Sequence, residues 1–287
     1  MTWIALAFLV NAQMLNGVVD IHLHSDPDSV PRSIDAIDVA RLARDRGERA
    51  IVLKNHFEPT ASLAYVVRKV VPGIEVFGGI DLNLTVGGVN PAAVEHMTKV
   101  KGGYGKVVWL PTFDSENQVR FNKEKRPFAA VAAHGRLLPE TLQVIALCAR
   151  HGLLLETGHS SAEEGLMIVR EAKKQEVKHI VVTHAMIAPI GMTIPQMKEA
   201  AGMGAYIEFV YNALIGPKKE FTFAQYAQAI RAVGPAHCIL SSDLRQAGNP
   251  LHPDGLAAFF EGLRGEGISQ ADVDLMAKTN PATVLGI

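Results

Sequence analysis

Two histidines stand two residues apart in the apolar segment VDIHLHSDPD, which spans residues 19–28. In an extended strand successive side chains alternate between two faces, so His22 and His24 share a face with Asp20 and the apolar residues share the other. Two imidazoles on one face can bind a metal ion, although a His-x-His pair on its own is more often a pair of surface histidines. The choice between these interpretations depends on whether further ligand-type residues follow later strands.

Residues of this kind fall at the expected carboxyl ends of the later strands. They are Lys54 and His56, Asp81 and Asn83, Asp114, His159, His184, Glu208 and Asp243. Four imidazoles gathered at the same ends of neighbouring strands would leave several ring nitrogens in need of hydrogen-bond partners, which is costly in a confined space. A divalent cation removes that cost, and imidazole nitrogen with carboxylate oxygen is a ligand set that suits zinc, manganese or iron. The pattern therefore indicates a metal site.

Eight short β-branched apolar runs predict the strands that place these residues. They span residues 18–24, 49–54, 74–80, 106–110, 152–157, 179–184, 205–210 and 237–242. Helical spacing of apolar residues occurs between them, and helix start signals such as Ser161 with Glu164 agree with it. Eight strand-then-helix units favour a single-domain α/β fold, a (β/α)8 TIM-type barrel whose active site lies at the carboxyl ends of the strands. A doubly wound open sheet is the alternative, but the segment HSDPDSVPRS after the first strand is no glycine-rich phosphate loop.

The domain boundaries follow from the same pattern. Residues 1–17 form an N-terminal lead-in segment, and residues 18–287 form the barrel. The connection 111–138 is the one oversized loop, and because long loops in compact domains are often functional, we expect it to cover the site. The apolar stretch near the N-terminus lacks a basic start and is too short to span a bilayer. We therefore expect a cytoplasmic protein, with export through a signal peptide as the alternative.

The composition restricts the partners. The 287 residues are 48% hydrophobic and 20% charged, with a net charge of -1 and no long run of either sign. This balance disfavours nucleic acid and anionic membranes as partners. The two cysteines, Cys148 and Cys238, lie in apolar stretches and give no disulfide framework. We expect a small-molecule substrate, and association into homo-oligomers stays open.

Five motifs resemble, in order, those of the amidohydrolase superfamily of metal-dependent hydrolases. They are VDIHLHSDPD at the first strand, ETGHSS at the fifth, VVTHA at the sixth, LSSDLRQ at the eighth and the closing TNPATVLGI. The resemblance implies a (β/α)8 barrel in which His22 and His24 bind one metal ion. It implies that His159 and His184 bind a second ion or help to bind the first. It also implies that Asp243 binds metal and handles the proton.

Strand four departs from the pattern of that superfamily. Most two-metal members carry a bridging carbamylated lysine or a glutamate there, whereas VVWLPTFDSEN has no lysine at its carboxyl end and Lys106 lies at the other end. The lysine at the right height is Lys54 on strand two, in phase with His56. Near two cations its amine is disfavoured as an ammonium, and the neutral form can take up CO2 to give a carbamate that bridges metals. An ammonium that binds a substrate anion, at a one-metal site, is the alternative.

The cofactor prediction is one or two divalent ions, with zinc first and manganese or iron as alternatives, and a carbamate on Lys54. A metal lowers the pKa of its bound water to ~7 and so supplies hydroxide at neutral pH. Asp243 would accept the proton of that water and deliver it to the leaving group. We predict a metal-dependent hydrolase that cleaves a C–N, C–O or P–O bond of a small molecule. No G-x-S-x-G elbow is present and neither cysteine lies beside a candidate base, which argues against a serine or cysteine nucleophile.

Three alternatives stay open. The same metal site could serve a lyase reaction, such as decarboxylation or hydration. A phosphoesterase of the polymerase-and-histidinol-phosphatase type also begins with His-x-His, but it normally has a seven-stranded barrel. The third alternative is a binding barrel without catalysis.

Loops at the same rim supply the predicted substrate contacts. These are His56, Asp114, Arg245 and His252. Asp20, one pleat deeper than His22, is predicted to be a structural hydrogen-bond acceptor. Glu208 is either a group beside the ligands or a buried acid with its own partner.

Overall fold

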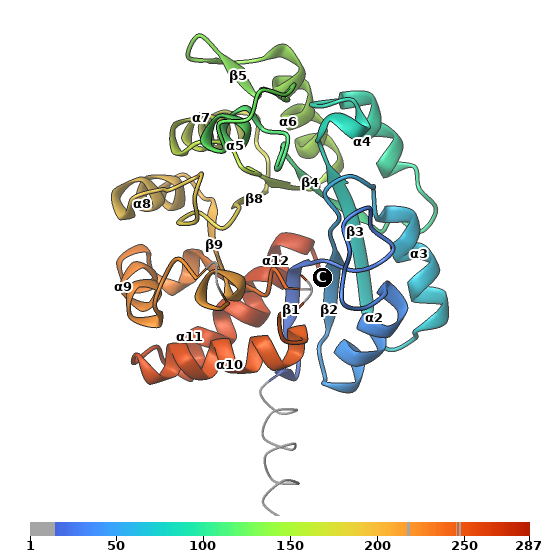
Figure 1. Ribbon diagram of the computed structural model, residues 1–287, viewed down its shortest axis with the longest axis vertical. Helices are drawn as coiled ribbons and strands as arrows, with labels where there is room; N and C mark the ends of the chain where they lie inside the picture. Colours follow the sequence, from blue (N-terminus) through green and yellow to red (C-terminus); the bar gives the residue numbers. More distant parts are fainter. Residues whose placement is uncertain (1–14, 217–218, 245, 247) are drawn as a thin grey trace, which may run out of the picture.

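The computed structural model describes residues 15–216, 219–244, 246 and 248–287, and eight parallel strands form its centre (Figure 1). In pairing order the strands are β1 (Val19–Leu23), β2 (Ala50–Leu53), β3 (Glu75–Asp81), β4 (Gly105–Trp109), β7 (Leu154–Glu156), β8 (His179–Val182), β9 (Tyr206–Val210) and β10 (Cys238–Ser241). Each strand overlaps one of the eight predicted runs. Asp243 donates its N–H to His22 O at 2.9 Å beside β1, and His24 donates to Leu244 O at 3.3 Å, which closes the barrel between β10 and β1. Eight strands also argue against the seven-stranded phosphoesterase barrel.

Helices follow the strands and surround them (Figure 1). They are α2 (Ala36–Asp45), α3 (Ala61–Val70), α4 (Pro91–Thr98), α5 (Glu116–Phe121), α6 (Pro139–His151), α7 (Ala162–Lys174), α8 (Ile194–Gly202), α9 (Phe223–Val233), α10 (His252–Gly265), α11 (Gln270–Asp274) and α12 (Asn280–Leu285). Capping boxes begin α7, α8 and α9, and the one at α7 is the predicted pair Ser161 and Glu164. These pairs satisfy N–H groups that a helix start leaves free, so the start signals in the sequence mark real helix ends.

Apolar packing fills the barrel and its surroundings. One cluster combines residues of β1, β2, β3, β4, β7, β8 and β10 with residues of α12, so it lies inside the barrel with α12 against it. Further clusters lie between the strands and the outer helices. Gly79 on β3 leaves room inside, because a Cβ there would lie 2.2 Å from Val107 O and 2.5 Å from the Trp109 ring. The large Trp109 side chain therefore depends on a glycine in the neighbouring strand.

The side chains of β1 do not alternate as strictly as the sequence predicts. Val19 and Ile21 pack in the interior cluster, whereas Leu23 packs with α2 and α3 on the outside. The pairing register of β1 with β2 shifts between Asp20 and Leu23, and such an irregularity turns the following side chains toward the other face. The prediction that all the apolar residues of the segment share one face is therefore wrong. The same shift turns His22 into the barrel.

The connection 111–138 has structure of its own. It contains α5 and an antiparallel pair of short strands, β5 (Ala132–Ala133) and β6 (Arg136–Leu137).

Most of the predicted N-terminal lead-in segment (residues 1–14) lies outside the described residues, and Leu15 is buried in the core. Within the described ranges, none of the helices is both long and apolar enough to cross a membrane.

Candidate metal centre

A cavity of about 410 Å³ lies at the carboxyl ends of the strands. Five of the predicted site residues line it: His22, His56, His159, His184 and Asp243. Phe113 and Gln118 bring the connection 111–138 to its wall. The barrel therefore brings together residues that lie far apart in the sequence.

Donor atoms of His22, His24 and Asp243 lie within 4.8 Å of one another, at the carboxyl ends of β1 and β10. Asp243 Oδ1 lies 3.1 Å from His24 Nε2 and 3.4 Å from His22 Nε2. Asp243 adopts a left-handed backbone conformation with φ of 47°, which is uncommon for a residue with a side chain, and the Asp243 N–H bond to His22 O helps to hold it. The three donor atoms are arranged as a cation would require.

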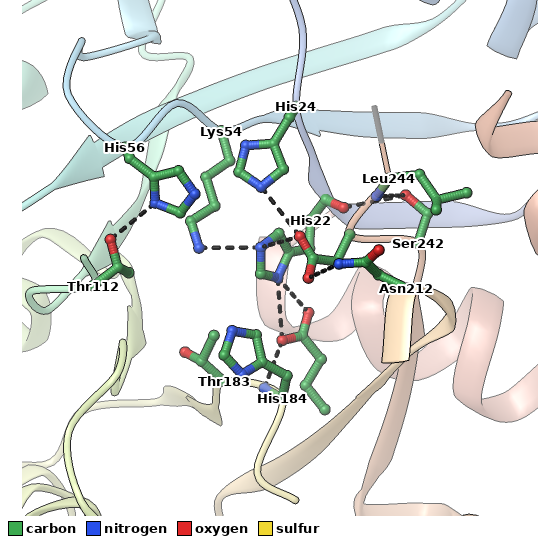
Figure 2. Close-up of polar contacts among 12 residues, drawn as sticks. His22, His24, Lys54, His56, Thr112, Thr183, His184, Asn212, Ser242 and Leu244 are labelled. Carbon is green, nitrogen blue, oxygen red and sulfur yellow. Dashed lines mark hydrogen bonds and ion pairs between the residues drawn. The ribbon is translucent and has the colours of Figure 1, made fainter. Parts of the chain in front are cut away.

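Lys54 points into the same cluster from the end of β2 (Figure 2). Its Nζ lies 3.0 Å from His22 Nε2 and 5.2 Å from the centre of the Trp109 ring. The side chain is fully buried. The structure thus brings the lysine of strand two to the imidazole nitrogen that also faces Asp243.

Two buried glutamates lie beside His22. Both oxygens of Glu208, on β9, lie 3.1–3.2 Å from His22 Nδ1, and Oε2 also accepts the N–H of His184 at 2.9 Å. Because an ionised carboxylate only accepts, Nδ1 of His22 carries a proton, and in the neutral form of the ring Nε2 presents its lone pair to the cluster. Burial and the Lys54 charge lower the pKa of His22, but the Glu208 and Asp243 charges raise it more. Glu208 is therefore a buried acid whose partners are two of the predicted ligands, His22 and His184.

Glu156, at the end of β7, was not predicted as a site residue. One of its oxygens accepts the hydroxyl of Thr183 at 3.0 Å, and the other, Oε1, is buried with no hydrogen-bond partner among the described residues. Donor atoms of Glu156, Glu208 and His22 lie within 4.8 Å of one another. An acid at the end of an otherwise apolar strand was the signal in the sequence.

His159 and His184 line the cavity from the segments that follow β7 and β8. Their ring centres are 5.0 Å apart, and the ring of His184 stacks at 5.8 Å on that of His22. His184 also has a positive φ, 24°. Gly158 allows the close turn before His159, because its φ is 61° and a Cβ would lie 2.1 Å from Leu110 O.

His56 closes the side of the cavity near β2. Its Nδ1 lies 2.9 Å from Thr112 Oγ1 and 3.4 Å from Asp81 Oδ2. Its ring stacks on that of His24 and lies tilted against that of Phe113, with ring centres 4.0 Å apart. The Asp81 and Thr112 side chains are themselves bonded at 2.8 Å. These contacts fix the ring and leave Nε2 for the cavity.

Two predicted substrate contacts have other roles. His252 is fully buried and is not among the described residues that line the cavity, and its Nε2 pairs with Glu48 Oε1 at 2.8 Å. Asp114 accepts the N–H of Leu84 on one oxygen and pairs with Arg126 through the other, so its carboxylate is engaged by the protein. The structure thus gives both side chains partners within the protein, and neither is among the described residues that line the cavity. Arg245 lies outside the described residues.

Asp20 has the structural role predicted for it. Its Oδ1 accepts the N–H groups of His22 and Ser242, both at 3.1 Å, and so joins β1 to the end of β10. Burial raises its pKa to about 6.

Burial keeps most of the imidazoles neutral. It lowers the pKa of His24 to about 3 and that of His184 to about 4, and it lowers the pKa values of His56 and His159 well below their ordinary range. Neutral imidazole is the form that binds a metal.

The carboxylates divide into an ionised and a protonated group. Burial raises the pKa of Asp243, but the neighbouring His22, His24 and His184 lower it more, so this pKa lies far below its ordinary value. Burial and then the Glu208 charge raise the pKa of Glu156 to about 8. The ionised carboxylate thus lies where the imidazole Nε2 atoms converge.

The donor set fits a divalent cation. Imidazole nitrogens and an ionised carboxylate are its preferred partners, and the Nε2 atoms of His22 and His24 both face the ionised carboxylate of Asp243.

Residues 17–208 match the profile of a family described as "Family of unknown function (DUF6282)". The chain belongs to this family. No curated protein matches the sequence.

Solved structures resemble the chain over nearly its whole length. An amidohydrolase from Pseudomonas aeruginosa has a TM-score of 0.64 at 14% identity and covers 96% of this chain and 98% of its own. The probable dipeptidase PvdM from Pseudomonas aeruginosa has a TM-score of 0.67 at 11% identity, covering 98% and 97%. A 2,6-dihydroxybenzoate decarboxylase from Rhizobium has a TM-score of 0.53 at 13% identity, covering 94% and 99%. At these identities the likeness shows the fold, and the predicted (β/α)8 barrel is confirmed.

Proposed function

We propose that this protein is a metal-dependent hydrolase of the amidohydrolase superfamily, which cleaves a C–N, C–O or P–O bond of a small molecule with water. The observation that carries the proposal is the convergence of His22 Nε2, His24 Nε2 and Asp243 Oδ1 at the base of a cavity. The amidohydrolase and the dipeptidase among the structures of similar fold support it.

His22, His24 and Asp243 would hold one divalent ion, with zinc as the first choice and manganese or iron as alternatives. His159 and His184 would hold a second ion or complete the coordination of the first. When bound, a divalent cation polarises the electrophilic oxygen of the substrate and makes a water molecule more acidic.

Asp243 is the proposed proton carrier. Its Oδ1 faces the two imidazoles, and its Oδ2 is 3.3 Å from Asn212 Nδ2 at the cavity wall. Oδ2 is therefore the atom that takes the proton of the attacking water and returns it to the leaving group. Asn212 keeps this oxygen in place by donating to it.

His56 is the proposed substrate contact. Because Thr112 holds Nδ1, Nε2 is free to bond to a polar atom of the substrate. Phe113, whose ring contacts that of His56 and which is 39% exposed, gives the same wall an apolar surface.

Lys54 is proposed to carry a carbamate, which would supply an anionic metal ligand beside His22. Its support is its complete burial and the 3.0 Å separation of Nζ from His22 Nε2. Metal-loaded protein that has been incubated with ¹³C-bicarbonate should show a carbamate ¹³C resonance. A Lys54→Arg variant treated in the same way should lack it. Full metal occupancy without that resonance would assign Lys54 as an ammonium.

The test of the proposed function is a substrate panel. Protein stripped with a chelator and reloaded with Zn²⁺, Mn²⁺ or Fe²⁺ is assayed on amides, lactones, esters and phosphoesters, with product analysis. We expect metal-dependent hydrolysis of one class. Because a decarboxylase also shares the fold, aromatic carboxylic acids belong in the panel, and release of CO2 alone would assign a lyase. Metal-loaded protein inactive on every class would assign a binding barrel.

A further inference from the structure

We propose that Gln118, on the long connection after β4, fixes the tautomer of His159 and thereby makes its Nε2 a metal-binding lone pair. This inference deepens the proposed function and rests on it for the role of His159. The geometry on which it stands is independent of any activity. Gln118 lines the cavity from α5, and its Oε1 lies 2.8 Å from His159 Nδ1.

A chain of hydrogen bonds sets the direction of this contact. Gln118 Nε2 donates to Asn122 Oδ1 at 3.1 Å, and Asn122 Nδ2 donates to Glu124 Oε1 at 3.0 Å. Glu124 also accepts from Nε of Arg126, and these donors lower the pKa of its carboxyl group, so it is ionised and can only accept.

The Glu124 carboxylate, at the end of this series of hydrogen bonds, orients the side-chain amides of Asn122 and Gln118. Because Glu124 accepts, Asn122 must turn its NH2 group toward it and its oxygen toward Gln118. Gln118 must then turn its NH2 group toward Asn122 and its oxygen toward His159. The oxygen accepts the proton of Nδ1, and in a neutral imidazole the other nitrogen, Nε2, is then unprotonated.

The backbone of His159 is held to the same segment. Ser115 Oγ and Asn117 Nδ2 donate to His159 O at 3.2 and 3.0 Å, and His159 N donates to Pro111 O at 3.0 Å. The Asn117 amide also reaches Pro189 O, at 3.0 Å, in the loop that follows His184. The segment around α5 therefore positions His159 through both its main chain and its ring, which assigns a positioning role to the long connection.

The direct test is the tautomer of His159 in metal-free protein. Long-range ¹H–¹⁵N spectra of histidine-labelled protein distinguish a proton on Nδ1 from one on Nε2. We expect wild type to show His159 protonated at Nδ1, Gln118→Met to show a mixture or the opposite tautomer, and Gln118→Glu to keep the wild-type form. Gln270→Met is the matched control, because Gln270 makes the same kind of contact one helical turn along, to Asp274 on α11. A proton on Nε2 in wild type would overturn the inference.

A second readout follows the metal. Replacing a group that orients a metal-bound histidine weakens binding by about 10- to 100-fold, so Zn²⁺ titration against a competing chelator should show this loss in Gln118→Met and recovery in Gln118→Glu. Equal Zn²⁺ affinity in Gln118→Met and wild type would overturn the inference. Wild type that binds no Zn²⁺ would instead refute the proposed function, while the spectra still decide the tautomer. Should Gln118→Met not fold, Asn122→Ala, which frees the Gln118 amide to turn over, is expected to give a mixed tautomer, and an unchanged one would contradict the proposal.

Discussion

His22, on β1, and His159, which follows β7, reach the same cavity, but different parts of the molecule orient their rings. His22 is aimed by Glu208, a buried carboxylate of β9, and its backbone is bonded to Asp243 beside β10. His159 is aimed by a glutamine of the connection 111–138. The barrel itself therefore builds one half of the site, and a loop completes the other half. Substitutions in the barrel should abolish the site, whereas substitutions in the loop should adjust it.

The largest effect is expected at the barrel half. Replacing Asp243 by Asn removes the proton acceptor and should lower kcat by ~10²–10⁴-fold. Asp45→Asn, at an exposed carboxylate that ends α2, is the matched control and should leave kcat unchanged. Steady-state kinetics on whichever substrate the panel identifies measures both, and a kcat for Asp243→Asn within a few-fold of wild type would remove Asp243 from the mechanism.

His252 tests whether every histidine near the carboxyl end of β10 belongs to the site. It follows β10 as Asp243 does, but it pairs with Glu48 in the interior. Because removing one partner leaves the other charge buried, His252→Ala should lower the free energy of unfolding by about 3–5 kcal/mol with little change in KM. Denaturant unfolding with parallel kinetics checks this. A raised KM at unchanged stability would restore the substrate contact that the sequence suggested.

Glu208 tests whether the carboxylate of β9 aims His22. Glu208→Gln keeps the size of the side chain but removes the charge, and it should weaken metal binding by about 10- to 100-fold. The control is Glu199→Gln. Glu199 lies on α8, is exposed, and forms an ion pair with Arg170 of α7. Metal titration is the measurement, and equal affinity in Glu208→Gln and wild type would show that the strands alone position His22.

The smallest effect is expected at the loop half. Asn117→Ala removes the amide that joins His159 O to Pro189 O, and a lost hydrogen bond of this kind costs roughly 1 kcal/mol. We expect kcat/KM to fall by about fivefold, the equivalent of that free energy. A loss as large as that of Asp243→Asn would erase the distinction between the two halves.

The sequence predicted the barrel well because local patterns encode it. Apolar β-branched runs mark strands, and capping pairs such as Ser161 with Glu164 mark helix starts. The His-x-His of β1 was recognisable for the same reason, since its spacing is local. The contacts that the sequence did not predict, such as that of His252 with Glu48, join residues that lie far apart in the sequence. The residues near His252 in the sequence do not predict its contact with Glu48. Those near Gln118 do not predict its hydrogen bond with His159.

The metal content of the purified protein tests the central claim most directly. Elemental analysis compares wild type, reloaded with Zn²⁺ and dialysed, with a His22→Ala, His24→Ala double variant prepared in the same way. The account predicts one or two ions per wild-type chain and at least one fewer in the double variant. Wild type that retains no ion, or a double variant that retains as many, would contradict it.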